Sequence, residues 1–354
     1  MLESLFGQSL FTALASRNRL CELVCVANGC TDHTAAVARE IFERQGRQHT
    51  NRDWLSCHVT DLLERGKLNA WNQFVHAISS RKAQFLFLMD ADILLRHKQT
   101  LENMLTALET DGQASVSMDQ PRKDILFKGR PSFRERLSLL ASEITGSSRA
   151  QLCAQLYCIR ADVARNIHLP KDLPACEDGF IKQVVCTDFL TRELVPARLR
   201  LAQAAEHTFE AYTSPSAIVK NQKRQIIGQT VVHVLVDEYL KALPLAQRLR
   251  LATTLKELDR ADPPWLKRLI REHLRKKRFF WRLYHGLLTH RLASLAQLPA
   301  LDRLRCLPAA LGGSLAALIA CWMAFRTLKT GSIDYWPRPE RLGLDRLETV
   351  GHGT

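Results

Sequence analysis

Two acidic residues, Asp90 and Asp92, directly follow the apolar run Phe85 to Met89 and are the first candidates for chemistry in this sequence. A continuous apolar run with a polar end is typical of a strand buried on both faces, so we expect it in the middle of a parallel sheet. Side chains two residues apart in an extended chain point the same way, which directs both carboxylates to one place at the carboxyl end of the strand. Like charges held that close favour a bound cation, and carboxylate oxygens suit Mg²⁺ or Mn²⁺. The alternative is a solvated turn in which Asp92 caps a helix that starts near Leu94.

Two earlier segments have the composition of phosphate-binding turns. Asn28-Gly29-Cys30-Thr31-Asp32 lies between a predicted short strand, Glu22 to Ala27, and a predicted helix, Thr34 to Arg44. Free amide groups at the start of such a helix face the ligand edge of the sheet. Further along, Gly66-Lys67 opens a predicted helix that runs to about His76. Lys67 could meet a diphosphate there as a point charge, whereas on an isolated helix a lysine is more often simply solvated.

The elements around these segments predict the fold class. Strands are also expected at Leu55 to Val59 and at Ala114 to Met118, and an amphipathic helix at Thr100 to Leu108. The 354 residues can hold one large α/β domain and an appendage. We therefore predict an α/β protein with a mostly parallel, Rossmann-like sheet and helices on both faces.

Composition restricts the partners and the compartment. The formal net charge of +14 calls for an anionic partner, which could be nucleic acid, an anionic membrane surface or a phosphorylated substrate. The ten cysteines include no C-x-x-C pair and no zinc-type spacing, so we expect reduced thiols in a cytosolic compartment. Residues 1–20 lack the basic start and small-residue cleavage site of a signal peptide.

Four groups of residues, taken in order, carry a resemblance to a known family. They are Val26 to Asp32; Gly66-Lys67 with Ala70 and Asn72; Leu88 to Asp92; and Gln155 to Arg160 followed by Leu169-Pro170 and Cys176 to Phe180. Together they resemble the successive motifs of inverting glycosyltransferases of family two, which have the GT-A fold. The resemblance extends over about residues 2–224. It implies a GT-A domain at 1–225, with a nucleotide-binding half at about 1–120 and an acceptor-binding half at about 121–225, and leaves 226–354 as a helical, basic C-terminal region.

The resemblance also implies roles for individual residues. Asp178 would be the general base that takes the proton from the acceptor hydroxyl, and Glu177 beside it would position that site. Taken alone, Glu177-Asp178 could instead be a helix start in which Asp178 caps Phe180 to Val185. Asp90 and Asp92 would lie at a divalent cation, Mn²⁺ or Mg²⁺, on the donor diphosphate, with Asp92 as the more direct ligand. His207 could complete that metal site, although a lone histidine is more commonly structural. The residues implied around the nucleotide sugar are Asn28, Asp32, Asp61, Lys67 and Asp90.

Two departures from the family pattern affect the expected activity. Ala27 stands where the family commonly has an aspartate before the Asn-Gly pair. The family's chain also usually begins with a strand, whereas residue 1 here corresponds to the helix that would follow it. The main prediction is transfer of a sugar, by default from a UDP-sugar, to a lipid-linked or cell-envelope glycan with inversion. The alternatives are a truncated or inactive GT-A module acting as a membrane-associated binding subunit and, more distantly, a nucleotidyltransferase.

The C-terminal third predicts contact with a membrane. Arg275-Lys276-Lys277-Arg278 is followed by Phe279-Phe280-Trp281, a combination that suits an interfacial helix on anionic headgroups. No zinc, helix-turn-helix or stacking-sheet motif accompanies the basic residues, so nucleic acid is not the expected partner. Residues 307–325 form a nearly uncharged stretch that could be a single membrane span, a half-inserted hairpin or a buried helix. The expected location is the cytoplasmic side of a membrane, peripherally or through this one segment.

Overall fold

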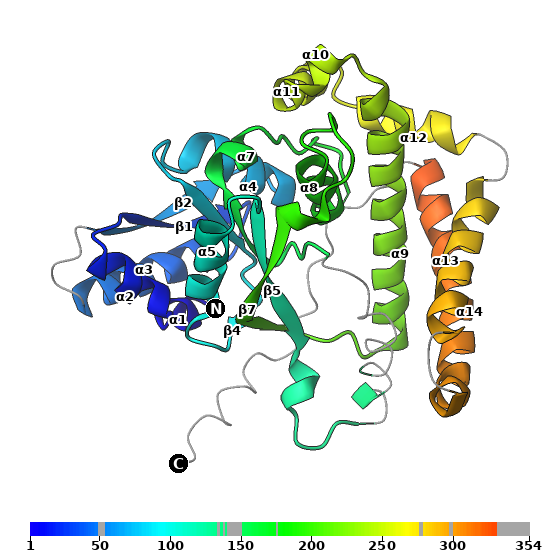
Figure 1. The fold of residues 1–354 in the computed structure, drawn as a ribbon, viewed down its shortest axis with the longest axis horizontal. Helices are drawn as coiled ribbons and strands as arrows, with labels where there is room; N and C mark the ends of the chain where they lie inside the picture. Colours follow the sequence, from blue (N-terminus) through cyan, green and yellow to red (C-terminus); the bar gives the residue numbers. More distant parts are fainter. Residues whose placement is uncertain are drawn as a thin grey trace.

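The computed structural model describes residues 1–48, 54–132, 135–136, 139, 151–174, 176–275, 279–296 and 300–330. An α/β body forms one side of the molecule, and a column of long helices from the C-terminal region forms the other (Figure 1). The predicted α/β class with a mainly helical C-terminal region is therefore confirmed.

The first part of the body is a strand, helix and strand unit in which two parallel strands pair. β1 and β2 run in continuous register from Cys21 opposite Leu55 to Asn28 opposite Leu62. The expected strands at Glu22 to Ala27 and Leu55 to Val59 are confirmed, as is the helix between them. The elements are α1 (Leu2–Phe6), α2 (Ser9–Ser16), β1 (Cys21–Asn28), α3 (Thr34–Gln48) and β2 (Leu55–Leu62).

A second sheet has the strand order β3-β6-β5-β7-β4. The pairs β3/β6, β5/β6 and β4/β7 are antiparallel and β5/β7 is parallel. Across both sheets, parallel pairing accounts for most of the registered residues. The strands are β3 (Phe85–Met89), β4 (Leu94–Leu95), β5 (Val116–Lys123), β6 (Leu156–Arg160) and β7 (Leu199–Phe209).

Two local expectations about β3 are wrong. It does not lie in the middle of a parallel sheet, because it pairs antiparallel with β6 and stands at one end of the strand order. An apolar run reports burial, and it does not report the direction of the neighbouring strands. Asp92 also does not cap a helix near Leu94, because Leu94 and Leu95 form β4.

Helices cover both faces of the second sheet. On β6, Tyr157 and Ile159 face one hydrophobic cluster with Phe180 of α8, whereas Leu156 and Cys158 face another with helices α2 and α5. Alternate residues of a strand point to opposite faces, so β6 is buried on both. The helices involved are α4 (Lys67–Gln73), continued by a π-helical turn η1 (Phe74–Ile78), and α5 (Thr100–Thr110), α7 (Ala161–Arg165) and α8 (Glu177–Cys186); short 3₁₀ turns are η2 (Asp124–Phe127) and η3 (Pro196–Arg198).

The C-terminal region is a set of helices packed against the body and against one another. α9 begins with Pro215 after Ser214, whose hydroxyl oxygen accepts a hydrogen bond from the Ala217 amide at 3.2 Å. α14 packs along α9 and α13 (Figure 1). The elements are α9 (Pro215–His233), η4 (Val234–Tyr239), η5 (Leu240–Ala242), α10 (Leu245–Arg248), α11 (Leu251–Ala261), α12 (Trp265–Leu274), α13 (Phe279–Ala296) and α14 (Ala300–Thr330).

The stretch 307–325 lies within α14. Among the helices that the structure describes, none combines the length and apolar character needed to cross a bilayer. Of the alternatives for this stretch, the structure shows a packed helix, with Ala317, Ala320, Cys321, Ala324 and Leu328 buried. Lys276 to Arg278, which were part of the expected interfacial segment, lie outside the described residues.

His76 in the π-helical turn provides a pH-dependent contribution to stability. Its Nε2 lies 2.8 Å from the carbonyl oxygen of Ile167, and burial together with nearby Lys256 lowers the pKa of His76 from 6.5 to about 4. His76 binds a proton below about pH 6.5 in the unfolded chain but only below about pH 4 in the folded protein. The stability of the fold should therefore decrease as the pH drops from 6.5 to 4. The effect should be on the order of 1 kcal/mol after screening by solvent.

Urea unfolding between pH 4 and 7 would test this contribution. His76→Gln keeps a side-chain amide donor for the Ile167 carbonyl but cannot titrate. The variant should therefore lose less stability than the wild type between pH 6.5 and 4. Parallel pH profiles for the two proteins would contradict the assignment.

Candidate active site

The end of β3 brings the two predicted aspartates into different environments. The Asp90 amide donates to the carbonyl oxygen of Gln155 at 2.8 Å, which fixes the backbone at the strand end against β6. Asp92 is exposed, and within the described part of the chain its carboxylate is not engaged in a hydrogen bond or ion pair. It is close enough to Asp90 to raise the pKa of that carboxyl. Asp92 is thus the member of the pair that is available to a ligand.

Lys67 joins the end of β3 to the start of α8. Its Nζ lies 2.8 Å from Oδ1 and 2.9 Å from Oδ2 of Asp90, and 2.9 Å from Oε1 of Glu177. Glu177 is only 3% exposed, so its carboxylate needs the cation. Residues separated by more than a hundred positions in the sequence are therefore held around one ammonium group.

The ionisation of this cluster reflects burial and charge together. Burial would lower the pKa of Lys67, but the carboxylates of Glu177 and Asp90 outweigh it and raise the pKa above the usual value for lysine. Burial raises the pKa of Asp90 to about 6, against the opposing effect of Lys67. Lys67 therefore stays charged, while Asp90 becomes fully ionised only above about pH 6.

Asp178 lies beside this cluster in the first turn of α8. Its Oδ1 accepts a hydrogen bond from the Gly179 amide at 2.7 Å. Burial, and next the neighbouring Glu177, raise the pKa of Asp178 above the usual value for an aspartate. A half-buried carboxylate with a raised pKa has the properties of a general base.

Two side chains feel the charges of both Asp90 and Asp178. Burial raises the pKa of the Cys153 thiol to about 11, and Asp119, Asp178 and Asp90 contribute to that rise. Burial also raises the pKa of Tyr157, with contributions from Glu177, Asp90 and Asp178. The Tyr157 hydroxyl accepts a hydrogen bond from Trp71 Nε1 at 2.6 Å. The acidic residues at the end of β3 and at the start of α8 thus both act on the pKa of Cys153 and of Tyr157.

The predicted nucleotide-side residues are only partly joined to this cluster. Oδ1 of Asn28 accepts a hydrogen bond from the Gly66 amide at 2.9 Å, which places the turn after β1 next to Lys67. Oδ1 of Asp32 accepts from the amide and the hydroxyl of Thr34 at 3.1 and 2.5 Å, at the start of α3. Asp61 is an exposed residue of β2 in register with Ala27. Asn28 is therefore connected to the cluster through Gly66, whereas Asp32 organises the helix start.

The turn after β1 requires a glycine. Gly29 has a φ of +61°, and a Cβ there would lie 2.8 Å from Cβ and 2.9 Å from Cα of Arg65. The left-handed backbone and the close approach of the Arg65 segment both exclude a larger residue. Gly29 thus lets the two phosphate-type turns, at 28–32 and 65–67, come together.

His207 is fully buried and reaches the cluster through Gln155. Its Nδ1 lies 2.7 Å from Oδ2 of Asp119, and its Nε2 lies 3.3 Å from Oε1 of Gln155. Among the residues that the structure describes, the Asp119 Oδ1 atom has no hydrogen-bond partner. A carboxylate on one ring nitrogen orients the other, which is the arrangement found behind many metal-binding histidines. Within the described residues, however, no group of three or more His, Cys, Asp or Glu side chains converges in a way that could hold a metal ion.

Sequence reasoning did not identify Asp119, Gln155, Tyr157 or Trp71 as site residues. Asp119 lies within β5, directly after Val116-Ser117-Met118, so an acidic residue next to apolar strand residues was a weaker signal for it. Gln155 and Tyr157 lie in a segment already noted for its motif. Trp71 carried no sequence signal, because its role depends on the buried Tyr157 hydroxyl.

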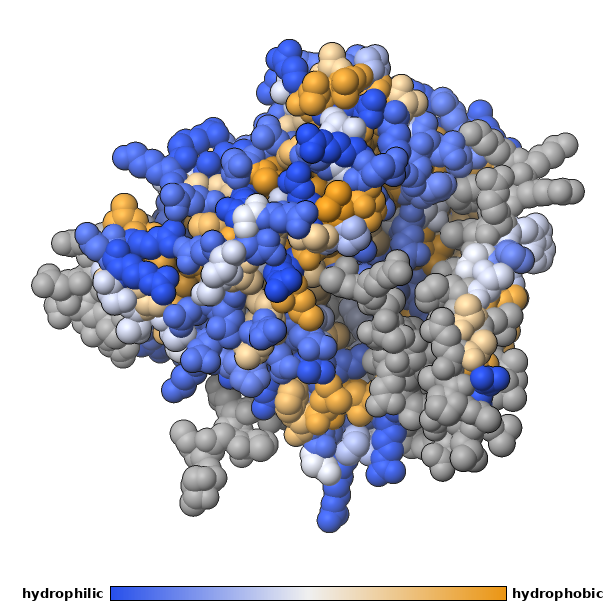
Figure 2. Space-filling view, in the orientation of Figure 1, coloured by the Kyte–Doolittle hydropathy of each residue, from blue (hydrophilic) through white to orange (hydrophobic). Residues whose placement is uncertain are grey.

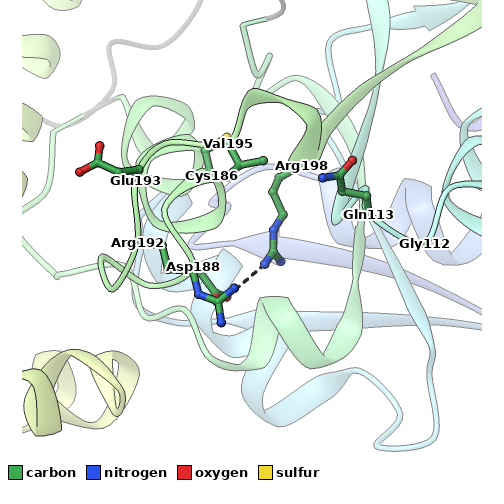
Figure 3. Close-up of a pocket in the computed structure, with 8 residues that line it drawn as sticks. All are labelled: Gly112, Gln113, Cys186, Asp188, Arg192, Glu193, Val195 and Arg198. Carbon is green, nitrogen blue, oxygen red and sulfur yellow. Dashed lines mark ion pairs between the residues drawn. The ribbon is translucent and has the colours of Figure 1, made fainter.

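A cavity elsewhere contains none of the predicted residues. It has a volume of about 250 Å³ and lies at the C-terminal end of α8, away from Glu177 and Asp178 (Figure 3). Asp188 forms ion pairs with Arg192 and Arg198, each at 3.4 Å, so much of the charge in this cavity is internally balanced. Its lining residues are Gly112, Gln113, Cys186, Asp188, Arg192, Glu193, Val195 and Arg198.

Comparisons with known proteins give a family match and similarities to solved structures. Residues 2–154 match the family described as glycosyl transferase family 2. The crystal structure of glucosyl-3-phosphoglycerate synthase from Mycobacterium tuberculosis in complex with phosphoglyceric acid is similar at 13% identity and a TM-score of 0.36, over 63% of this chain and 82% of that one. No curated protein matches the chain.

Proposed function

Because residues 2–154 match glycosyl transferase family 2, we propose that this protein transfers a sugar from a nucleotide-sugar donor, by default a UDP-sugar, to a hydroxyl group of an acceptor. Transfer would proceed by direct displacement, with inversion at the anomeric carbon. The family match supports glycosyl transfer in general, and we propose the donor, the acceptor and the stereochemistry in addition.

The observation that carries this proposal is the Lys67 bridge between Asp90 and Glu177. The Asp90 end of β3 supports the donor side, and the Glu177-Asp178 start of α8 supports the acceptor side. A displacement reaction requires the attacking hydroxyl and the departing group to be held in line across one short space. A single half-buried cation that joins the two segments fixes the distance between them.

Asp178 would act as the general base. The acceptor hydroxyl must lose a proton as it attacks, and a carboxylate within reach of that hydroxyl can take it. The Gly179 amide holds one Asp178 oxygen, which leaves the other for the acceptor. Glu177, fixed by Lys67, would set the position of Asp178 rather than take part in proton transfer. Asn28, Asp32 and Asp61 would lie on the nucleotide side.

Asp92 is the described residue that is best placed to meet a divalent cation at the diphosphate, because the Asp90 carboxylate is bound by Lys67 and both ring nitrogens of His207 are engaged. Within the described residues, Asp92 offers an unengaged carboxylate at the strand end, and the Asp119–His207 pair is linked to the Asp90 backbone through Gln155. We propose that Asp92 would hold Mn²⁺ or Mg²⁺ directly, with Asp90 and His207 in support. When bound, such a cation would stabilise the negative charge of the departing nucleoside diphosphate.

We further propose a lipid-linked or cell-envelope glycan as the acceptor, used on the cytoplasmic side of a membrane. The high positive charge favours an anionic surface over a neutral soluble acceptor. The described cysteines are free thiols, which fits a reducing compartment.

Nucleotide release by the full-length protein tests the proposal. The protein would be incubated with Mn²⁺ or Mg²⁺ and a panel of nucleotide sugars, and the released nucleotide would be measured. We expect release from one donor class, and a loss of at least about 100-fold in Asp92→Ala, because one carboxylate ligand to the cation is removed. Absence of release with every donor, or equal release by Asp92→Ala, would overturn it. Nucleotide binding without release would instead indicate an inactive binding module.

A further inference from the structure

The outward face of α14 carries a regular line of exposed side chains, which we call the α14 outer stripe: Leu315, Ile319, Trp322, Arg326 and Lys329. The three apolar members are 62%, 44% and 55% exposed, in that order, and the two basic members are also exposed. Spacings of four and three residues place all five within about 80° around the helix and along about 21 Å of its length. The stripe is apolar at its start and basic at its end.

The opposite face of the same helix is buried against neighbouring helices. Ala317, Ala320, Cys321, Ala324 and Leu328 are buried, and the helix contacts α9 and α13. The small side chains on this face allow close helix contact. The α14 outer stripe is therefore not needed to hold the helix in place, and three large apolar side chains remain in water.

In the part of the chain whose side chains are described, the other exposed apolar residues do not form a comparable line. Figure 2 shows apolar patches at the top of the molecule over α10 and at the bottom near η2. These places have the exposed pairs Leu245 and Leu249, and Leu126 and Phe127. Phe127 is partly covered, because the Arg96 guanidinium lies 3.6 Å from its ring centroid. Neither pair continues into basic residues aligned on the same helical face.

We propose that the α14 outer stripe docks on an anionic lipid surface, with α14 lying in the plane of the membrane. The apolar residues would enter the boundary between headgroups and acyl chains, and Arg326 and Lys329 would contact lipid phosphates. The Arg326 guanidinium already lies 5.6 Å from the Trp322 ring centroid, so the charged group and the interfacial indole act at one place.

The charge of the protein favours a lipid surface over a second copy of the chain. Two molecules with a net charge of +14 each repel one another. An anionic bilayer instead attracts both the whole molecule and the basic end of the stripe. This docking surface goes beyond the proposed function. It rests on that function only because a lipid-linked or cell-envelope acceptor would give the protein a reason to bind a membrane.

Vesicle flotation with the full-length protein tests the docking surface. The probes are phosphatidylcholine vesicles with and without phosphatidylglycerol. The wild type should bind only the vesicles that contain phosphatidylglycerol. Arg326→Gln with Lys329→Gln should weaken partitioning by about 25-fold, since each basic residue near the surface contributes about fivefold. Leu315→Ser with Trp322→Ser should also weaken binding, by at least about tenfold.

The matched control is Lys82→Gln with Lys98→Gln, which removes two exposed charges from the α/β body. It should change partitioning by less than about threefold. Equal loss in this control, unchanged binding by both stripe variants, or no binding by the wild type would overturn the proposal. A wild-type dimer in sedimentation that is lost in Leu315→Ser with Trp322→Ser would also overturn it.

Activity measurements separate this inference from the proposed function. The stripe variants should release nucleotide from a soluble donor at the wild-type rate, because α14 contributes none of the site residues. Asp92→Ala should bind phosphatidylglycerol vesicles as the wild type does. Loss of nucleotide release with intact vesicle binding would therefore count only against the catalytic proposal, and the converse only against docking.

Discussion

Asp178→Asn is expected to lower the rate of sugar transfer by about 10³-fold, with little change in the affinity for the donor nucleotide. Asparagine keeps an oxygen that can accept the Gly179 hydrogen bond at the start of α8, but it cannot take the proton from the acceptor hydroxyl. The loss should therefore appear in kcat. Transfer would be followed by nucleotide release, and nucleotide affinity by calorimetry.

The control for this variant is Asp162→Asn, an exposed aspartate in the first turn of α7. It should leave transfer within about twofold of the wild type. In the wild type, transfer should also fall as the pH is lowered, beginning above the usual aspartate range because burial and Glu177 raise the pKa of Asp178. Transfer by Asp178→Asn within about tenfold of the wild type would exclude this residue as the base.

Lys67→Met is expected to abolish transfer and to destabilise the fold by about 3 kcal/mol. The substitution removes the cation between Asp90 and Glu177 and leaves the almost fully buried Glu177 carboxylate without its partner. Both the distance between the donor and acceptor sides and the charge balance would be lost. Denaturant unfolding and nucleotide release measure the two effects separately.

Two further variants distinguish the buried ion pair from a general effect of losing a lysine. Lys82→Met removes an exposed lysine and should have almost no effect. Lys67→Met combined with Glu177→Gln should recover a large part of the lost stability, because the orphaned charge is gone, yet it should remain inactive. If the double variant is no more stable than Lys67→Met alone, the pairing of Lys67 with Glu177 does not explain the destabilisation.

Local sequence patterns were sufficient to predict most of the elements that position the site. The apolar run at 85–89 and the turn at 28–32 with its helix are where the patterns placed them. These features depend on burial, periodicity and turn residues, which are properties of short segments. The antiparallel pairing of β3 with β6 is not such a property, because it depends on a strand about seventy residues further along.

The partners of the site residues could not be predicted in the same way. Lys67 was expected to meet a diphosphate or to be solvated, and the structure shows it between Asp90 and Glu177. His207 was predicted from its position near the end of a late strand, but its contacts with Asp119 and Gln155 depend on the packing of β5, β6 and β7. Residue types and their order therefore predict sugar transfer at these acidic residues. The three-dimensional contacts determine how the side chains are arranged around one another.

A crystal structure of the full chain with UDP and Mn²⁺, in which anomalous scattering locates the metal, would test directly whether Asp90, Asp92 and Asp178 form one sugar-transfer site. We expect one manganese ion bound to the Asp92 carboxylate and the diphosphate, on the side of the site that faces Asp178. Manganese bound elsewhere, or a nucleotide bound away from Asp90, Asp92 and Asp178, would contradict it.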